Sequence, residues 1–201
     1  MNPCSLAGAL ARTKLLCMAA TVEYLCSCCG DVHRGLPAWH FDAPVQVAAI
    51  PVAERTERVE LTTDACVIGG IDQPQFYAKG LLEIPVIGEN EPFVWGIWLS
   101  LSEDSMLRYG ELFEDHQRDA GESFFGWVCN SIPGYPETQL LKARLHVRTY
   151  PQRPWIELEP TEHRLALDQR RGITREHAIS LAERLLHAGQ GRSPSASRPA
   201  G

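Results

Sequence analysis

The sequence lacks a long hydrophobic run, because no apolar stretch approaches the about 20 residues that a membrane-spanning helix needs. It also lacks a basic excess. The 19 Lys and Arg residues are outnumbered by 25 Asp and Glu, and the formal net charge is -6. This balance opposes the large cationic surface that binds a phosphate backbone. We therefore expect neither a membrane nor a nucleic acid as a partner.

Familiar catalytic and disulfide signatures are missing as well. The chain contains no Gly-x-Ser-x-Gly elbow, no glycine-rich phosphate loop and no His-Glu-x-x-His helix. Its seven cysteines are odd in number, and three of them crowd into residues 26–29. Secreted disulfide domains carry an even, spaced cysteine framework instead. The cysteine usage favours a reducing, cytoplasmic location.

The length of 201 residues allows one well-filled core, whereas two domains would each be small. We expect a single domain over residues 22–187. Residues 188–201 contain almost no apolar side chains, which predicts a disordered tail. Residues 1–21 are predicted to be an N-terminal extension, and a translation start at Met18 would place most of it outside the native protein.

Period-two alternation of apolar side chains marks the predicted strands. The clearest strand is 92–102, and further strands are expected over 61–70, 75–87, 124–132, 140–150 and 153–160. The last two, joined by a short Pro-containing link, would form a hairpin. In the strand at 92–102, one side carries Phe93, Trp95, Ile97, Leu99 and Leu101.

Two helices have recognisable starts. Ser102 followed by two acidic residues predicts a helix to about residue 113, with Met106, Leu107 and Leu112 facing inward. Thr174 is the expected cap of a helix that ends at His187. The predicted fold is α+β, with a mostly antiparallel sheet of about five to seven strands and about two or three helices.

The stretch YLCSCCGDVH, residues 24–33, is the strongest chemical signal. Cys26 and Cys29 have the spacing that turns two thiolates toward one tetrahedral ion, Gly30 permits the tight turn, and His33 could be a third ligand. Fourth-ligand candidates are Cys28, His40, Cys66, Cys129 and His163. A structural zinc, cysteines that bind no metal, and redox chemistry are the alternatives. Gly30-Asp31 opposes the redox reading, because it interrupts the helix that usually follows a redox pair.

Residues 140–150 carry a basic stripe on one face: Lys142, Arg144, His146 and Arg148. Glu157 and Glu159 share a face of the next strand and would pair with this stripe across the hairpin. In another register the stripe would bind an acidic ligand or partner.

Two aromatic residues are candidates for a partner surface or pocket. Trp98 lies on the minor face of its strand, and Tyr135 lies in the PGYP turn. The alternative for both is a place in the core.

Six segments, in this order, resemble the bacterial family catalogued as domain of unknown function 2199. They are CSCCGDVHRGLP, DACVI, AKGLLEIPV, FVWGIWLSLSE, FGWVCNSIPGYPET and RPWIELEPTEHRLALDQRRGIT. The resemblance runs from about Tyr24 to about His187 and implies a compact cytosolic domain that begins with a Cys-x-x-Cys-Gly-x-x-His element. It implies no activity. Cys28 is extra relative to that element, so either cysteine pair could ligate a metal.

The leading interpretation is a non-catalytic domain with a zinc-knuckle-like N-terminal element that acts by binding another protein. The competing interpretation is a hydrolase or metal-dependent enzyme. Its pocket would use Cys129, His146, His163 or the carboxylates Glu83 and Glu157. An enzyme requires several of these groups to converge on one pocket. The oligomeric state does not follow from the sequence.

Overall fold

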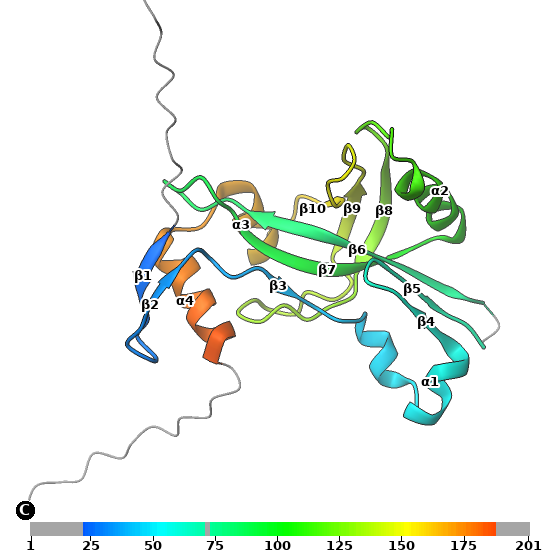
Figure 1. The fold of residues 1–201 in the computed structure, drawn as a ribbon, viewed down its shortest axis with the longest axis horizontal. Helices are drawn as coiled ribbons and strands as arrows, with labels where there is room; N and C mark the ends of the chain where they lie inside the picture. The colour runs from blue at the N-terminus through cyan, green and yellow to red at the C-terminus, as the bar shows by residue number, and fades with distance from the viewer. Residues whose placement is uncertain (1–21, 71–72, 188–201) are drawn as a thin grey trace, which may run out of the picture.

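The computed structural model describes residues 22–70 and 73–187 (Figure 1). The predicted extension at 1–21 and the predicted tail at 188–201 lie outside these residues. The described chain forms an α+β fold, as expected, with a two-stranded sheet and an eight-stranded sheet. None of its helices combines the length and apolar character that crossing a bilayer requires.

Five consecutive strands close into a barrel: β6 (Gln75–Ile84), β7 (Phe93–Leu101), β8 (Ser123–Val128), β9 (Lys142–His146) and β10 (Trp155–Leu158). Each strand pairs antiparallel with the next, and β10 closes the ring by pairing parallel with β6. At the closure, Trp155 lies opposite Leu81, whose N–H donates to the Pro154 carbonyl at 2.9 Å. Closure leaves no free edge within these five strands.

The barrel interior is filled by the alternating residues that the sequence pattern predicted for 92–102. Trp95, Ile97 and Leu99 are fully buried in the main core. Gly80 of β6 sits close to side chains of β9 and β10. A Cβ at this glycine would lie 2.7 Å from Leu145 Cδ1 and 2.8 Å from Ile156 Cγ1. The missing side chain therefore lets β6 pack against Leu145 of β9 and Ile156 of β10.

Three further strands extend the sheet on both sides of the barrel strands. On one side β5 (Ala65–Ile68) pairs with β6, and β4 (Val59–Leu61) pairs with β5. On the other, β3 (Trp39–His40) pairs parallel with β7. The 3-10 helix η1 (Val45–Ala49) and helix α1 (Val52–Arg58) connect β3 to β4.

A second, smaller core lies on the outer face of the barrel. It contains Val47 of η1, Cys66 of β5, Trp98 of β7 and Cys129. Trp98 is fully buried, and its indole N–H donates to the Phe41 carbonyl at 2.9 Å. The proposal that Trp98 lies on a partner surface is therefore wrong. The segment from β3 to η1 covers this residue, and the sequence pattern of β7 alone could not reveal that cover.

Helix α2 (Glu103–Glu114) begins as predicted, because the Ser102 hydroxyl accepts from the Ser105 N–H at 3.2 Å. Its buried residue is Tyr109, whereas Leu107, expected to face inward, is 63% exposed. Two helices follow β10: α3 (Arg164–Arg171) and α4 (Arg175–His187). The Gln169 side chain ties α3 to β10, accepting from Leu158 N–H and donating to the Ile156 carbonyl.

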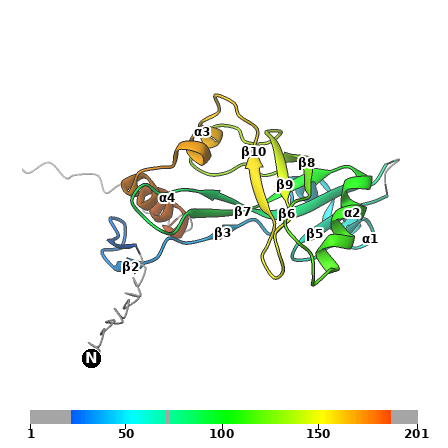
Figure 2. The same cartoon turned by 90° about the horizontal axis from the view of Figure 1, so that it is seen from above.

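The remaining strands, β1 (Glu23–Leu25) and β2 (Val32–Arg34), form a small antiparallel hairpin. Figures 1 and 2 place it beside α4, at the end of the molecule opposite α1 and α2. Val22 and Tyr24 are buried in the main core with Leu181 and Leu185 of α4. The two ends of the described chain therefore pack against each other.

The prediction of a mostly antiparallel α+β sheet is confirmed in outline and corrected in detail. The described residues contain four α-helices rather than about two or three, and the larger sheet has eight strands rather than about five to seven. This sheet closes into a barrel and contains two parallel pairings. The elements β1, β2 and β3 have two or three residues each, which is too few for a periodic pattern.

Candidate metal centre

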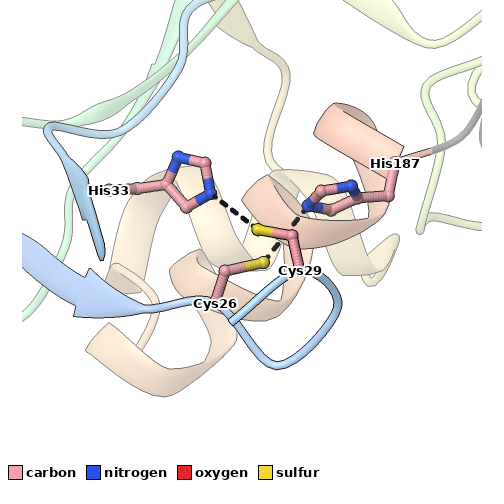
Figure 3. A group of neighbouring side chains, drawn as sticks. All are labelled: Cys26, Cys29, His33 and His187. Carbon is pink, nitrogen blue, oxygen red and sulfur yellow. Dashed lines mark hydrogen bonds between the residues drawn. The ribbon is translucent and has the colours of Figure 1, made fainter. Parts of the chain in front are cut away.

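The turn between β1 and β2 holds the two cysteines of the Cys-x-x-Cys pair. The Cys26 N–H donates to the Asp31 carbonyl at 2.8 Å, and the Gly30 N–H donates to the Cys26 carbonyl at 3.0 Å. Gly30 adopts φ +79°, a conformation that side-chain-bearing residues rarely accept. These bonds fold residues 26–31 into a tight loop that turns both sulfur atoms to the same side (Figure 3).

Four side chains converge at this loop: Cys26, Cys29, His33 and His187 (Figure 3). Their ligand atoms all lie within 4.8 Å of one another. The Cys26 Sγ is 3.2 Å from His187 Nε2, and the Cys29 Sγ is 3.5 Å from His33 Nε2. Three elements supply them, namely the β1–β2 turn, β2 and the last turn of α4.

The donor set and its spacing fit a tetrahedral metal ion. Zinc in structural sites binds two Cys and two His with Zn–S near 2.3 Å and Zn–N near 2.0 Å, which places neighbouring ligand atoms about 3.3–3.8 Å apart. The two sulfur-to-nitrogen distances, 3.2 and 3.5 Å, are close to that range. The group of four could therefore hold a metal ion.

Neighbouring residues hold the candidate ligands in place. The Tyr24 ring stacks on the His33 ring with centroids 5.4 Å apart. Glu183, one turn before His187 on α4, accepts hydrogen bonds from the backbone N–H and the hydroxyl of Ser27. The Cys28 N–H donates to the Cys26 Sγ at 3.4 Å. Such outer contacts orient metal ligands and tune their basicity.

The two thiols differ in acidity. Burial disfavours the Cys26 thiolate, but donation by the backbone N–H groups of Cys29 and Cys28 outweighs it and lowers the pKa of Cys26 to about 6. The Asp31 N–H favours the Cys29 thiolate, yet loss of solvent and the nearby Cys26 sulfur outweigh this and raise the pKa of Cys29. Deprotonation of both thiols would place two negative charges in one site, which is unfavourable. A bound dication compensates for this repulsion.

The fourth member of the group, His187, was not among the candidates drawn from the sequence. It lies 161 positions from Cys26, and a histidine in the last turn of a helix is ordinary. The weak signal for it was that α4 is amphipathic and ends in a single histidine. Cys28 is outside the group of four, so the pair that faces His33 and His187 is Cys26 and Cys29.

The other proposed fourth ligands lie elsewhere in the described residues. The His40 ring lies over Gly96. Cys66 and Cys129 are buried in the second core. His163 caps α3, accepting from the Leu165 N–H at 3.2 Å through Nδ1 while Nε2 donates to the Glu137 carbonyl at 3.1 Å.

The basic stripe has the predicted register, since Arg144 lies opposite Glu157 across β9 and β10. The ion pairs, however, do not join the residues that lie opposite each other in this register. Glu157 contacts His146 at 2.9 Å, and Arg148 contacts Glu83 at 2.8 Å. Within the described ranges, neither Lys142 nor Arg144 forms an ion pair with a carboxylate. In the stripe, His146 and Arg148 thus have carboxylate partners, whereas Lys142 and Arg144 have none among the described residues.

Tyr135 is half-buried and packs against the main core. Its hydroxyl group is buried, and burial together with the nearby Asp168 carboxylate raises its pKa. Its polar end therefore points into the protein, which makes it a poor contact for a partner.

The five residues of the proposed enzyme pocket do not converge on one site, although His146 and Glu157 contact each other at 2.9 Å. Cys129 is in the second core, His163 caps α3, and the remaining three lie near the outer side of β6, β9 and β10. Burial raises the pKa of Cys129 to about 12, which suppresses its thiolate. Cys129 and His163 are therefore separate from the other three groups, so the five do not form one pocket.

These observations define an α+β fold that contains a barrel and a Cys₂His₂ cluster. The cluster joins the first described hairpin to the last described helix. The profile of one family, described as an uncharacterized protein conserved in bacteria (DUF2199), matches residues 25–173. The chain belongs to this family. Cys26, Cys29 and His33 lie inside the matched residues, and His187 lies beyond them. No curated protein and no solved structure matches the chain.

Proposed function

We propose that this protein is a zinc-binding, non-catalytic domain in which Cys26, Cys29, His33 and His187 hold one structural zinc ion, and that it acts by binding another protein. The observation that carries the zinc assignment is the convergence of two sulfur and two nitrogen atoms within 4.8 Å. Cys₂His₂ is a standard donor set of structural zinc sites.

The number of protein ligands favours a structural role. A catalytic zinc site usually keeps a fourth position open for water or substrate, whereas this site offers four protein ligands. Redox chemistry is less favoured, because the cysteine pair lies in a turn between two strands and not at the start of a helix.

The position of the site indicates what the zinc would do. The turn that carries Cys26 and Cys29 belongs to the first described hairpin, and His187 ends the last described helix. Zinc at this point would fasten α4 to the β1–β2 hairpin, because a ligand that binds only the folded arrangement stabilises it.

Metal analysis tests the proposal. The full chain, purified without chelator, is expected to contain one equivalent of zinc by elemental analysis, retained in native and lost in denaturing mass spectrometry. Cys26→Ser should abolish the zinc, whereas Cys28→Ser, a matched change at a neighbouring thiol outside the group of four, should retain it. A metal-free wild type, or equal loss in both variants, would refute the zinc assignment.

A further inference from the structure

An exposed part of the sheet combines two aromatic rings with two cations. We call it the aromatic–basic face, and it consists of Phe125 and Trp127 of β8 with Lys142 and Arg144 of β9. The two rings are 39% and 37% exposed, and both cations are exposed. These residues are on the outer side of the barrel, because their alternating neighbours Phe124, Gly126, Ala143 and Leu145 are buried.

The aromatic rings form one ordered surface. Phe125 and Trp127 pack edge to face with centroids 5.4 Å apart. The Lys142 Nζ lies 5.6 Å from the centroid of the Trp127 ring, within the range of a cation–π contact. In register, Trp127 faces Lys142 and Phe125 faces Arg144. Each aromatic residue is therefore paired with a cation across the ladder.

The two cations lack carboxylate partners in the described part of the chain. Glu157 faces Arg144 from β10, but its carboxylate contacts His146 at 2.9 Å. Among the described residues, the Arg144 guanidinium donates one hydrogen bond, to the Ser123 hydroxyl at the long distance of 3.5 Å. Glu159 comes directly after β10, and its N–H donates to the Lys142 carbonyl at 2.9 Å. The positive charge of Lys142 and Arg144 thus remains available to an external anion.

We propose that the aromatic–basic face binds an extended, acidic segment of a partner protein. One carboxylate of that segment contacts the two cations, and a large apolar side chain packs on the two rings. Aromatic residues and Arg dominate the binding energy of protein interfaces. This inference deepens the protein-binding part of the proposed function and rests on it, but it does not depend on zinc.

Charge complementarity favours a short acidic protein segment over a polyphosphate. Two unpaired cations match one or two carboxylates, whereas a nucleic-acid strand needs many cations along its path. Glu157 and Glu159 border the face on the β10 side and would repel any anion that reaches them. The face therefore accepts one carboxylate at the two cations rather than a continuous row of phosphates.

Selection from a library of displayed random short peptides, with the full zinc-containing chain as target, tests the face. The expected consensus pairs Asp or Glu with an aromatic or large aliphatic residue. A synthetic consensus peptide should shift the Trp127 indole N–H resonance, and its affinity should fall as salt rises. Selection of no peptide, or of a consensus without acidic residues, would overturn the inference.

Charge reversal locates the binding. Arg144→Glu should weaken the consensus peptide about tenfold or more. The matched control is Arg171→Glu, a reversal at an exposed arginine of α3, which should leave the affinity unchanged. Both variants should keep the wild-type melting temperature. Equal binding by Arg144→Glu and wild type would overturn the inference, as would tighter binding of single-stranded oligo-dT to the same face.

The zinc content of the same preparations separates the possible failures. One equivalent of zinc with no peptide binding refutes the partner surface and leaves the zinc role standing. Peptides that bind at another face refute this surface and leave the protein-binding role standing. Peptide binding without zinc supports the surface and refutes the structural zinc.

Discussion

Cys26 and His187 are separated by 161 positions in the chain, and their Sγ and Nε2 atoms lie 3.2 Å apart. This contact joins the first described hairpin to the last described helix (Figure 3). Since His187 is the only member of the candidate metal group that α4 supplies within the described residues, it is the residue through which a bound metal would hold that helix.

Replacing His187 therefore distinguishes the contribution of the metal site from that of the rest of the fold. His187→Ala should lower zinc affinity by more than the about 10–100-fold that removing an outer partner costs. The amide protons of α4 should exchange faster, while those of β6 and β7 keep their protection. Hydrogen exchange and metal titration measure both effects. His177→Ala, in the same helix but outside the metal group, should change neither quantity.

Glu183 should act as a positioning residue for the site. Its carboxylate accepts two hydrogen bonds from Ser27, between the two cysteines. Glu183→Gln should lower zinc affinity about 10–100-fold without changing the one-to-one stoichiometry. Competition with a chromogenic zinc chelator measures the change. Arg184→Ala is the control that should keep wild-type affinity, because Arg184 lies next to Glu183 on α4 and donates a hydrogen bond to the Ser180 hydroxyl rather than to the metal group.

Gly80 and Gly110 should respond in opposite directions to the same substitution. A Cβ at Gly80 would meet Leu145 Cδ1 at 2.7 Å, so Gly80→Ala should destabilise the barrel by about 1–3 kcal/mol. A Cβ at Gly110, in α2, meets nothing within 4 Å, so Gly110→Ala should stabilise by about 0.5–1 kcal/mol. Urea denaturation measures both. A stabilised Gly80→Ala would contradict the barrel packing.

The buried thiols should be unreactive. Burial raises the pKa of Cys66 to about 11 and that of Cys129 to about 12. At pH 8 their thiolate fractions are about one in a thousand and one in ten thousand, and each rises as the pH approaches the pKa. Iodoacetamide labelling followed by peptide mass mapping should modify both residues slowly in the folded chain and quickly in urea. Equal rates in the two conditions would contradict their burial in the second core.

Local patterns predicted the local structure well. The alternation in 92–102 identified β7 and its core face, and Ser102 identified the start of α2. The hairpin of β9 and β10 also has its expected opposition of Arg144 and Glu157. These features depend on residues that are near in sequence or related by one turn, so periodicity and capping chemistry determine them.

Long-range features did not follow from those patterns. Barrel closure rests on the parallel pairing of Trp155 with Leu81, and a single register position leaves no sequence signal. Trp98 was misplaced because its cover comes from the segment around Phe41, which has no strong periodicity. His187 reaches the metal group only through the packing of α4 on the hairpin. Each of these contacts is set by tertiary packing rather than by local preference.

X-ray absorption at the zinc edge, on full chain purified without chelator, tests the central claim most directly. We expect one zinc per chain with two sulfur neighbours near 2.3 Å and two nitrogen neighbours near 2.0 Å, and one nitrogen fewer in His187→Ala. Absence of zinc, or a first shell with oxygen in place of the His187 nitrogen in the wild type, would contradict it.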